Sequence, residues 1–589
     1  MSDPQSILQE TFGFPAFRGV QESVVTRVMA GDHTLAVMPT GAGKSLCYQI
    51  PALARPGTGL VISPLIALMH DQVRSASAFG MRAAALTSAD DNRAETVARF
   101  RAGELDLLYV APERVTTEGF RDLIRSTPLS LIAIDEAHCV SEWGHDFRPD
   151  YRLLRPLLDG FADVPRLALT ATADERTRGD ILQQLGIAAE GLILSGFDRP
   201  NIRYAAAPRS GGGRQIADLI ARQKGAGIVY APTRIATDKL AAALASSGRS
   251  VRAYHAGLDT RVRAANQEAF VRSEDMVMVA TVAFGMGIDK PDVRFVIHAA
   301  LPKSVEAYYQ ETGRAGRDGD PATAHLFWAA DDFRKARERI GEVEEGRREG
   351  ERERLTALSE LVETPGCRRA ILLRHFGEHP PETCGNCDNC LNAPPVADAT
   401  EVARKLLSAA FRTGQRFGVG HLEKVLTGAA DERLANLGHD RLSVFGILTA
   451  DEMPLLRPVA RALQSRGVLI PTEHGGLMLG GPARAILRGE AEVQVVIPPP
   501  AKREKRRRDQ TEFAADPLFE ALRQTRRDLA TEAGVPPYVI FHDAVLRDIA
   551  AVRPISRSAL AQISGVGTAK LDRYGAAFLH TIEAFVEAA

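Results

Sequence analysis

A short segment near the N-terminus, residues 38–45, has the composition of a loop that binds phosphate groups. It reads Met-Pro-Thr-Gly-Ala-Gly-Lys-Ser, between an apolar run at 35–38 and a helical pattern. Glycines let backbone N–H groups approach phosphates, Lys44 supplies positive charge, and the Ser45 hydroxyl suits Mg²⁺. Read alone, the segment could also be a glycine-rich turn without a ligand. The predicted nucleotide contacts are Thr40, Gly41, Gly43, Lys44 and Ser45.

Two carboxylates, Asp135 and Glu136, follow a second apolar run at 131–134. In a parallel sheet, such positions at the carboxyl end of a strand are where ligands bind. Asp135, together with Ser45, is predicted to hold a magnesium ion. Glu136 can then orient or deprotonate the attacking water, because phosphoryl transfer depends on positioning and charge stabilisation.

Positive charge opposite the γ-phosphate is offered by the segment 310–317, which reads Gln-Glu-Thr-Gly-Arg-Ala-Gly-Arg. Arg314 and Arg317 are typical of arginine fingers, and Gln310 is a further candidate contact. This interpretation places ATP between two domains, so that hydrolysis changes their closure. A solvated basic helix is the alternative reading of the same residues.

Four cysteines cluster in a short span and are predicted to bind one zinc ion. They are Cys367, Cys384, Cys387 and Cys390. Four thiolates make a closed tetrahedral site with no position for water or substrate, which indicates a structural metal. Disulfides are the alternative, but six cysteines in 589 residues are too few for a disulfide scaffold.

The elements that must position these residues follow from hydrophobic patterning. Short apolar runs alternate with longer helical patterns from about residue 30 to 330, which is typical of α/β domains with parallel sheets, and the rhythm restarts near residue 200. An Arg- and Glu-rich helical stretch and the cysteines follow. Residues 400–490 combine helices with a glycine-rich hairpin signal, and residues 498–508 are proline-rich and then basic, as in a tether.

Composition is that of a globular, multidomain protein, with 45% hydrophobic and 25% charged residues and a net charge of −1. No apolar run approaches the ~18 residues needed to cross a bilayer. The first residues lack the features of an export signal, so we expect a cytoplasmic protein without a membrane partner.

The motif set resembles superfamily-two helicases and, within them, the RecQ family, from about residue 8 to 585. Four features carry the resemblance: the segments 17–21 and 135–149, the cysteine spacing and the C-terminal module. It implies an α/β fold with two tandem RecA-like parallel-sheet motor domains, a helical zinc-binding module, a winged helix and a small all-helical C-terminal domain. It also implies an ATP- and Mg²⁺-dependent DNA helicase that translocates 3′-to-5′ on single strands.

The resemblance implies further site residues. Phe14, Arg18 and Gln21 match the family's adenine-recognition motif, and Asp289 lies in a segment that matches another motor motif. Without the family, Phe14 would be an ordinary core residue. The implied DNA contacts are Trp143, Phe147 and Arg148 in the aromatic-rich loop, His474 in the hairpin and Tyr538 in the C-terminal module, where the basic pair Arg526-Arg527 is a second candidate.

The expected domain bounds combine the patterning and the resemblance. They are 1–198 and 199–332 for the motor domains, 333–395 for the zinc module, 396–492 for the winged helix, 493–513 for a basic linker and 514–589 for the helicase-and-RNase-D C-terminal (HRDC) domain. A monomer acting on single-stranded and forked DNA in recombination and repair is implied, with single-strand-binding protein as a candidate partner. An RNA-remodelling ATPase and an architectural DNA-binding protein are the competing hypotheses.

Overall fold

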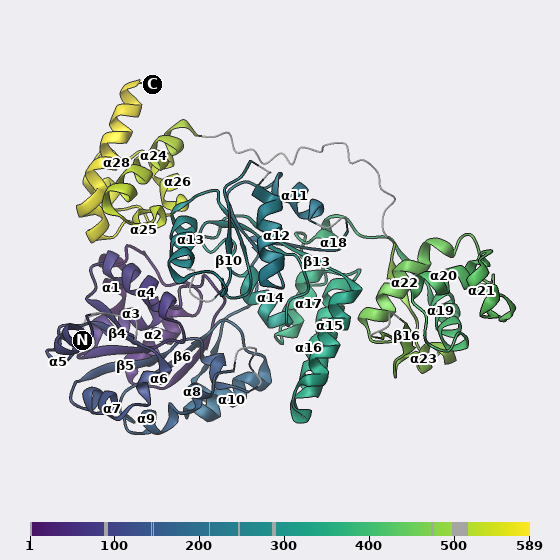
Figure 1. The fold of residues 1–589 in the computed structure, drawn as a ribbon. Coiled ribbons are helices and arrows are strands. Elements are labelled where there is room, and N and C mark those ends of the chain that lie inside the picture. The colour runs from purple at the N-terminus through teal and green to yellow at the C-terminus, as the bar shows by residue number, and fades with distance from the viewer. Residues whose placement is uncertain are drawn as a thin grey trace.

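The structure is a computed structural model that describes residues 3–87, 92–142, 144, 147–210, 213–245, 248–285, 290–472, 476–497 and 516–588. Two α/β domains lie next to each other, with the second at the centre of the molecule (Figure 1). The domain containing α19–α23 extends to one side, and the helices α24–α28 lie against the α/β domains on another.

The first α/β domain is built on a seven-stranded, wholly parallel sheet in the order β3-β4-β2-β5-β6-β1-β7. Its strands are β1 (Thr34–Val37), β2 (Thr58–Ile62), β3 (Ala83–Leu86), β4 (Leu107–Val110), β5 (Leu129–Ile134), β6 (Arg166–Thr170) and β7 (Leu192–Leu194). Its helices are α1 (Pro4–Glu10), α2 (Gln21–Ala30), α3 (Leu46–Ala54), α4 (Ile66–Ala78), α5 (Arg93–Arg101), α6 (Pro112–Val115), α7 (Glu118–Arg125), α8 (Pro149–Arg152), α9 (Arg155–Asp159) and α10 (Glu175–Leu185). The central strands β1, β2 and β4 are buried along their whole length, as expected for parallel strands covered by helices on both faces.

The strand order brings the predicted catalytic segments together. β6 lies between β1 and β5 and runs parallel to both. The loop after β1 carries the phosphate-binding motif and the loop after β5 carries the two carboxylates. Both therefore lie at the same edge of the sheet, where ligands of open α/β sheets bind.

The second α/β domain has a six-stranded parallel sheet in the order β10-β11-β9-β12-β13-β8. Its strands are β8 (Ile202–Pro208), β9 (Ala226–Tyr230), β10 (Val251–Tyr254), β11 (Val277–Ala280), β12 (Val293–His298) and β13 (Ala322–Trp328). Its helices are α11 (Arg214–Ile220), α12 (Arg234–Ala245), α13 (Thr260–Arg272) and α14 (Val305–Thr312). The loop after α14 bears both predicted arginine fingers.

The cysteine module packs onto the second α/β domain and shares its core. It contains α15 (Ala330–Glu342), α16 (Glu345–Glu363), α17 (Arg368–His375) and α18 (Asp388–Leu391). Leu358 and Leu373 of this module belong to the same buried cluster as Tyr204 and Leu326 of the second α/β domain. The module is thus an extension of that domain.

Two further domains have cores of their own. The first contains β14 (Val396–Asp398), α19 (Thr400–Arg412), α20 (Val419–Thr427), α21 (Glu432–Asn436), α22 (Met453–Ser465), β15 (Leu469–Pro471), β16 (Leu477–Leu479), α23 (Ala483–Arg488) and β17 (Gln494–Val496). The antiparallel pair β15–β16 flanks the predicted hairpin tip, as in a winged helix. The last domain contains α24 (Pro517–Ala533), α25 (Pro537–Ile540), α26 (Asp543–Val552), α27 (Arg557–Leu560) and α28 (Thr568–Ala588). The predicted architecture is confirmed.

Among the described helices, none combines the length and the apolar character needed to cross a membrane.

Candidate functional site

The loop between β1 and α3 (the phosphate loop, residues 38–45) depends on two glycines with positive φ. Gly41 has a φ of 84° and Gly43 a φ of 74°, a region that side chains with a Cβ rarely adopt. The Lys44 ammonium donates to the carbonyl oxygens of Met38 at 3.2 Å and Pro39 at 3.3 Å. The lysine is therefore folded back over its own loop and faces the cavity described below.

The two carboxylates after β5 lie beside this loop. An oxygen of Asp135 accepts a hydrogen bond from the Glu136 backbone N–H at 3.0 Å. Glu136 has a φ of 49°, which costs a non-glycine residue about 1 kcal/mol or more and is typical of functional sites. Its carboxylate lies 3.3 Å from the buried His138 ring, which contacts the Thr170 hydroxyl at 3.0 Å. The strained turn thus aims both acids at the edge of the sheet.

Ser45 and Asp135 could together hold a magnesium ion. The Ser45 hydroxyl donates to the side-chain oxygen of Gln72 at 3.0 Å, and both Ser45 and Asp135 line the same cavity. Hydroxyl and carboxylate oxygens are the ligands that Mg²⁺ prefers. Gln72, on α4, was not predicted from the sequence, because its helix has no motif that marks it.

The predicted adenine-recognition residues surround the entrance to the phosphate loop. The Gln21 amide accepts from the Arg18 backbone N–H at 2.9 Å and donates to the Ala42 carbonyl at 2.8 Å. The Arg18 guanidinium lies 5.6 Å from the centre of the Phe14 ring. Gln21 therefore connects the N-terminal segment to the phosphate loop.

A cavity of about 400 Å³ brings the predicted residues of both α/β domains together. Its walls include Phe14, Arg18, Gln21, Thr40, Gly41, Gly43, Lys44, Ser45, Asp135 and Glu136 from the first domain and Gln310, Arg314 and Arg317 from the second. Arg314 is only 4% exposed, so its charge is held inside the protein rather than on a solvated helix face. The solvated-helix alternative is therefore wrong for Arg314.

The cavity has a third wall that the sequence did not predict. Tyr538, His542 and Lys570 of the C-terminal helical domain line it as well. Lys570 is buried, with its ammonium 4.6 Å from the centre of the Phe79 ring. Burial lowers the pKa of Lys570 to about 8. Tyr538 thus lies over the predicted nucleotide site.

Backbone and charge contacts hold this domain against both α/β domains. Gly565 N–H donates to the Gly13 carbonyl at 2.8 Å, and the Thr568 hydroxyl donates to the Glu10 carbonyl at 2.7 Å. On the other side, Glu274 lies within 2.6–3.1 Å of three guanidinium groups, those of Arg523, Arg526 and Arg527. Arg526, a candidate for DNA phosphates in the sequence, is 2% exposed and is instead committed to this contact.

Three predicted residues, Trp143, Asp289 and His474, lie outside the described part of the chain. The other two predicted residues of the aromatic-rich loop, Phe147 and Arg148, are described. Arg148 donates to the Pro64 carbonyl at 2.9 Å, and the Arg152 guanidinium lies 5.4 Å from the centre of the Phe147 ring. The end of the aromatic-rich loop is therefore connected to the segment after β2.

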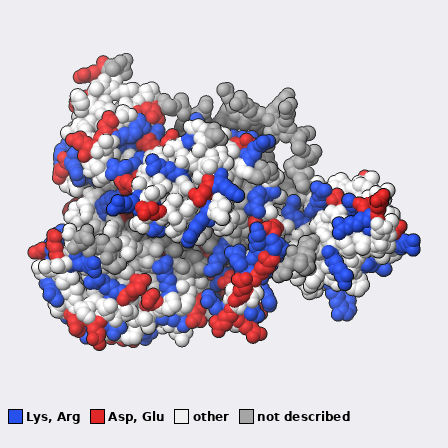
Figure 2. Space-filling model, viewed as in Figure 1, with Lys and Arg blue, Asp and Glu red and all other residues white. Residues whose placement is uncertain are grey.

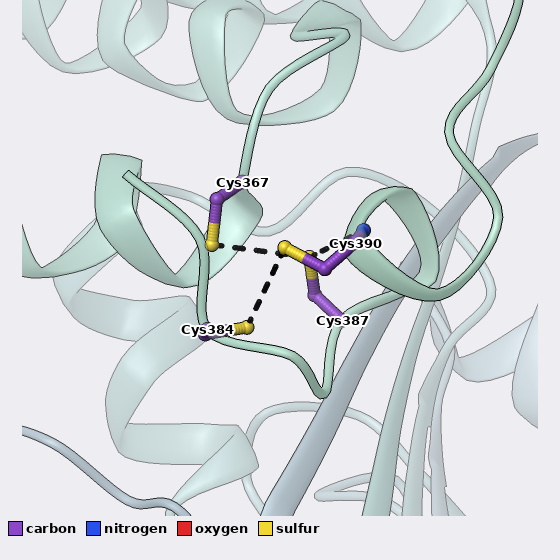
Figure 3. A group of neighbouring side chains, drawn as sticks. All are labelled: Cys367, Cys384, Cys387 and Cys390. Carbon is purple, nitrogen blue, oxygen red and sulfur yellow. Dashed lines mark hydrogen bonds between the residues drawn. The ribbon is translucent and has the colours of Figure 1, made fainter. Parts of the chain in front are cut away.

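The four predicted cysteines converge on one point (Figure 3), and their sulfur atoms all lie within 4.8 Å of one another. The Cys384–Cys390 and Cys367–Cys387 sulfur pairs are each 3.9 Å apart. Zinc–sulfur bonds of about 2.3 Å in a tetrahedron place sulfurs roughly 3.8 Å apart. Backbone N–H groups also point at three of the sulfurs, which favours thiolates. The cluster fits a structural Zn²⁺, and the disulfide alternative is wrong because all four cysteines are free.

Family models match the chain in five consecutive segments. They are a DEAD/DEAH box helicase model at residues 18–181, a helicase conserved C-terminal domain at 213–319, a RecQ zinc-binding model at 330–391, an RQC domain at 393–504 and an HRDC domain at 515–582.

Curated relatives match over nearly the whole chain. The ATP-dependent DNA helicase RecQ of Haemophilus influenzae is 41% identical over 98% of this chain and 95% of its own length. The protein of the same name from Bacillus subtilis is 37% identical over 99% of this chain and 98% of its own.

Proposed function

Because the chain belongs to the RecQ family of ATP-dependent DNA helicases, we propose that it couples ATP hydrolysis to 3′-to-5′ translocation on single-stranded DNA and to the unwinding of duplex DNA. One observation carries this proposal. A single cavity is lined by Lys44, Asp135 and Glu136 on one α/β domain and by Arg314 and Arg317 on the other. Hydrolysis in such a cleft changes how tightly the two domains close, and this change can become motion along a strand.

The cavity residues divide the work of hydrolysis. Lys44 compensates the charge of the β- and γ-phosphates, and the glycines of the phosphate loop expose backbone N–H groups to them. Glu136 orients the attacking water and accepts its proton, while Arg314 and Arg317 stabilise the charge that develops on the γ-phosphate. Ser45 and Asp135 would hold a magnesium ion, which would neutralise further phosphate charge.

Specificity for ATP is assigned to the residues around the base. Gln21 hydrogen-bonds to the edge of the adenine with its amide, Phe14 stacks on the adenine ring, and Arg18 lines the cavity beside them. Gln310 and Asp289 complete the nucleotide contacts; Asp289 is assigned on its motif alone.

The DNA contacts belong mainly to the phosphate backbone. Trp143, Phe147 and Arg148 are proposed to sense a single strand beside the catalytic carboxylates, and His474 to stack on the terminal base pair at the hairpin. Tyr538 becomes available to a strand when its domain leaves the cavity. Figure 2 shows Lys and Arg side chains, interspersed with acidic ones, across the second α/β domain and the winged-helix domain, which suits contacts that do not depend on sequence.

The proposal extends to organisation and setting. We assign the bounds 1–198 and 199–332 to the motor domains, 333–395 to the zinc module, 396–497 to the winged helix, 498–513 to the basic linker and 514–589 to the HRDC domain. The winged helix extends beyond the expected bound of 492, because β17 pairs with β14 and Val493 and Val495 belong to its core. We propose that the protein is a monomer that works in recombination and repair in the bacterial cytoplasm and nucleoid, with single-strand-binding protein as a candidate partner.

Strand separation on defined substrates tests the proposal. Purified protein is given ATP, Mg²⁺ and labelled forked duplexes made of DNA or of RNA, each with a 3′ or a 5′ single-stranded tail. We expect unwinding of 3′-tailed DNA and its loss in Lys44→Ala. Lys335→Ala is the matched control, because Lys335 is an exposed lysine paired with Asp331 on α15.

The other outcomes identify the competing functions. Unwinding of RNA alone would indicate an RNA-remodelling ATPase. ATP turnover without strand separation would indicate a DNA-binding protein whose ATPase only regulates occupancy.

A further inference from the structure

The segment that joins the two α/β domains (the interdomain segment, residues 197–201) carries one arginine, Arg199, whose guanidinium contacts both domains. Arg199 is 8% exposed. Its hydrogen-bond acceptors are the carbonyl oxygens of Thr40 at 2.6 Å, Gly313 at 3.1 Å, Ala315 at 2.9 Å and Gly316 at 2.9 Å. The first belongs to the phosphate loop. The other three belong to the loop after α14 that bears both predicted arginine fingers (the finger loop, residues 313–317).

The backbone of the interdomain segment is held in place by contacts that do not involve Arg199. The Phe197 ring stacks on Phe376 of the zinc module with centroids 4.6 Å apart, and Asn386 of the same module donates to the Pro200 carbonyl at 3.0 Å. Asn201 donates to the Gly316 carbonyl at 2.8 Å. These contacts fix the backbone on both sides of Arg199, so the position from which its side chain extends is fixed as well.

The two loops that Arg199 joins also approach each other at the backbone. A Cβ on Gly41 would lie 3.3 Å from the Cα of Arg317, and a Cβ on Gly313 would lie 3.1 Å from the Thr40 hydroxyl oxygen. At these two points the loops are too close for a side chain on either glycine. Small changes in the guanidinium contacts therefore change where the finger loop lies.

We propose that Arg199 is a positioning residue that holds the finger loop at a fixed distance from the phosphate loop, so that Arg314 and Arg317 meet the γ-phosphate. The inference rests on the proposed function, in which these arginines act on ATP. Arg199 itself is not among the residues that line the cavity, so it would act through the finger loop. A planar guanidinium can reach four converging carbonyl oxygens, whereas the ammonium of a lysine donates from a single point.

Arg199→Lys tests this role because it keeps the positive charge and removes the planar guanidinium that contacts both loops. We expect kcat for DNA-stimulated ATP hydrolysis to fall about 10- to 100-fold, since a misplacement near 1 Å has this effect, with KM for ATP little changed. Arg209→Lys is the matched control. Arg209 donates to the Ala299 carbonyl at 2.7 Å and to Asp332 at 2.8 Å in the same domain, outside the cavity. It is expected to retain kcat.

Two readouts separate positioning from simple stabilisation of the fold. Amide hydrogen exchange should accelerate in the peptide covering 313–319 in Arg199→Lys and not in Arg209→Lys. In a double-mutant cycle, the loss of kcat in Arg199→Lys/Arg314→Lys should be smaller than the product of the two single losses, because both changes remove the contribution of Arg314. Independent, multiplicative losses would overturn the proposal, as would full kcat in Arg199→Lys.

Failure of the inference can be distinguished from failure of the proposed function. If Lys44→Ala and Arg314→Lys lose hydrolysis while Arg199→Lys does not, only the role of Arg199 is wrong. If Arg314→Lys and Arg317→Lys both hydrolyse ATP normally, the assignment of the arginine fingers is wrong as well.

Discussion

Arg526 donates a hydrogen bond to Glu274 at 2.7 Å and so joins the C-terminal helical domain to the second α/β domain. Arg526 is almost fully buried, and it also pairs with Asp543 of its own domain at 2.7 Å. A buried guanidinium with two carboxylate partners depends on both. The Glu274 contact is therefore central to this docking.

Glu274→Ala is expected to release the C-terminal domain. Breaking a buried ion pair typically costs about 3–5 kcal/mol, and this figure is an upper limit for Glu274→Ala because Arg526 keeps Asp543 as a partner. The radius of gyration from small-angle X-ray scattering should increase. Glu338→Ala, which removes an exposed pair with Arg334, serves as the control, and an unchanged scattering profile in Glu274→Ala would contradict the prediction.

Glu136→Gln is expected to separate ATP binding from hydrolysis. The amide keeps the shape of the side chain and cannot accept the proton of the attacking water, so kcat should fall by about 10²- to 10⁴-fold. Affinity for a fluorescent ATP analogue should remain close to that of the unchanged protein. Normal turnover by this variant would assign the base elsewhere.

Cys387→Ala is expected to abolish zinc binding, measured by mass spectrometry of the metal content. The unchanged protein should carry about one zinc ion per chain, and the variant should unfold at a lower temperature, because zinc binding contributes directly to folding. Cys139→Ala replaces a buried cysteine outside the cluster and should retain the metal. Equal metal content in the two variants would rule out the assigned site.

The ion pair between the buried Glu306 and the partly buried His375, 2.8 Å apart, should make stability depend on pH. Burial acts to raise the pKa of Glu306, but the hydrogen bond and charge of His375 outweigh it and lower that pKa from 4.5 to about 2. Burial acts to lower the pKa of His375, but Glu306 outweighs it, so this pKa lies above 6.5. The carboxylate shift corresponds to a stabilisation on the order of 3 kcal/mol.

The sign of the two shifts defines a window. The carboxylate contribution is present above pH 4.5 and is lost as pH falls toward 2, whereas the imidazolium contribution is present below pH 6.5 and is lost as pH rises through the raised pKa. Chemical denaturation should show a larger destabilisation by His375→Gln at about pH 6 than at about pH 9. Equal destabilisation at both values would contradict the prediction.

The sequence predicted the elements whose composition follows from full burial. The runs at 35–38 and 131–134 correspond to β1 and β5, because a strand covered on both faces is apolar throughout. β3 was not predicted, since its residues Ala-Ala-Ala-Leu carry little strand preference. The ends of β1 and β5 then located Lys44, Asp135 and Glu136.

Contacts between distant segments could not be predicted in this way. Arg199 meets backbone carbonyl groups, which every residue possesses, so no pattern in the chain marks its partners. Arg526 appeared basic and exposed because its partner Glu274 is 252 residues away. The position of Tyr538 over the nucleotide cavity could not be predicted either, because the docking of a tethered domain leaves no signal in the local sequence.

The third wall of the cavity creates a thermodynamic linkage. Since Tyr538 and Lys570 share this space with Lys44 and Gln21, any factor by which docking changes nucleotide affinity must equal the factor by which the nucleotide changes docking. Each round of binding and release therefore also biases the docking equilibrium of a domain that begins beyond residue 500 of the chain.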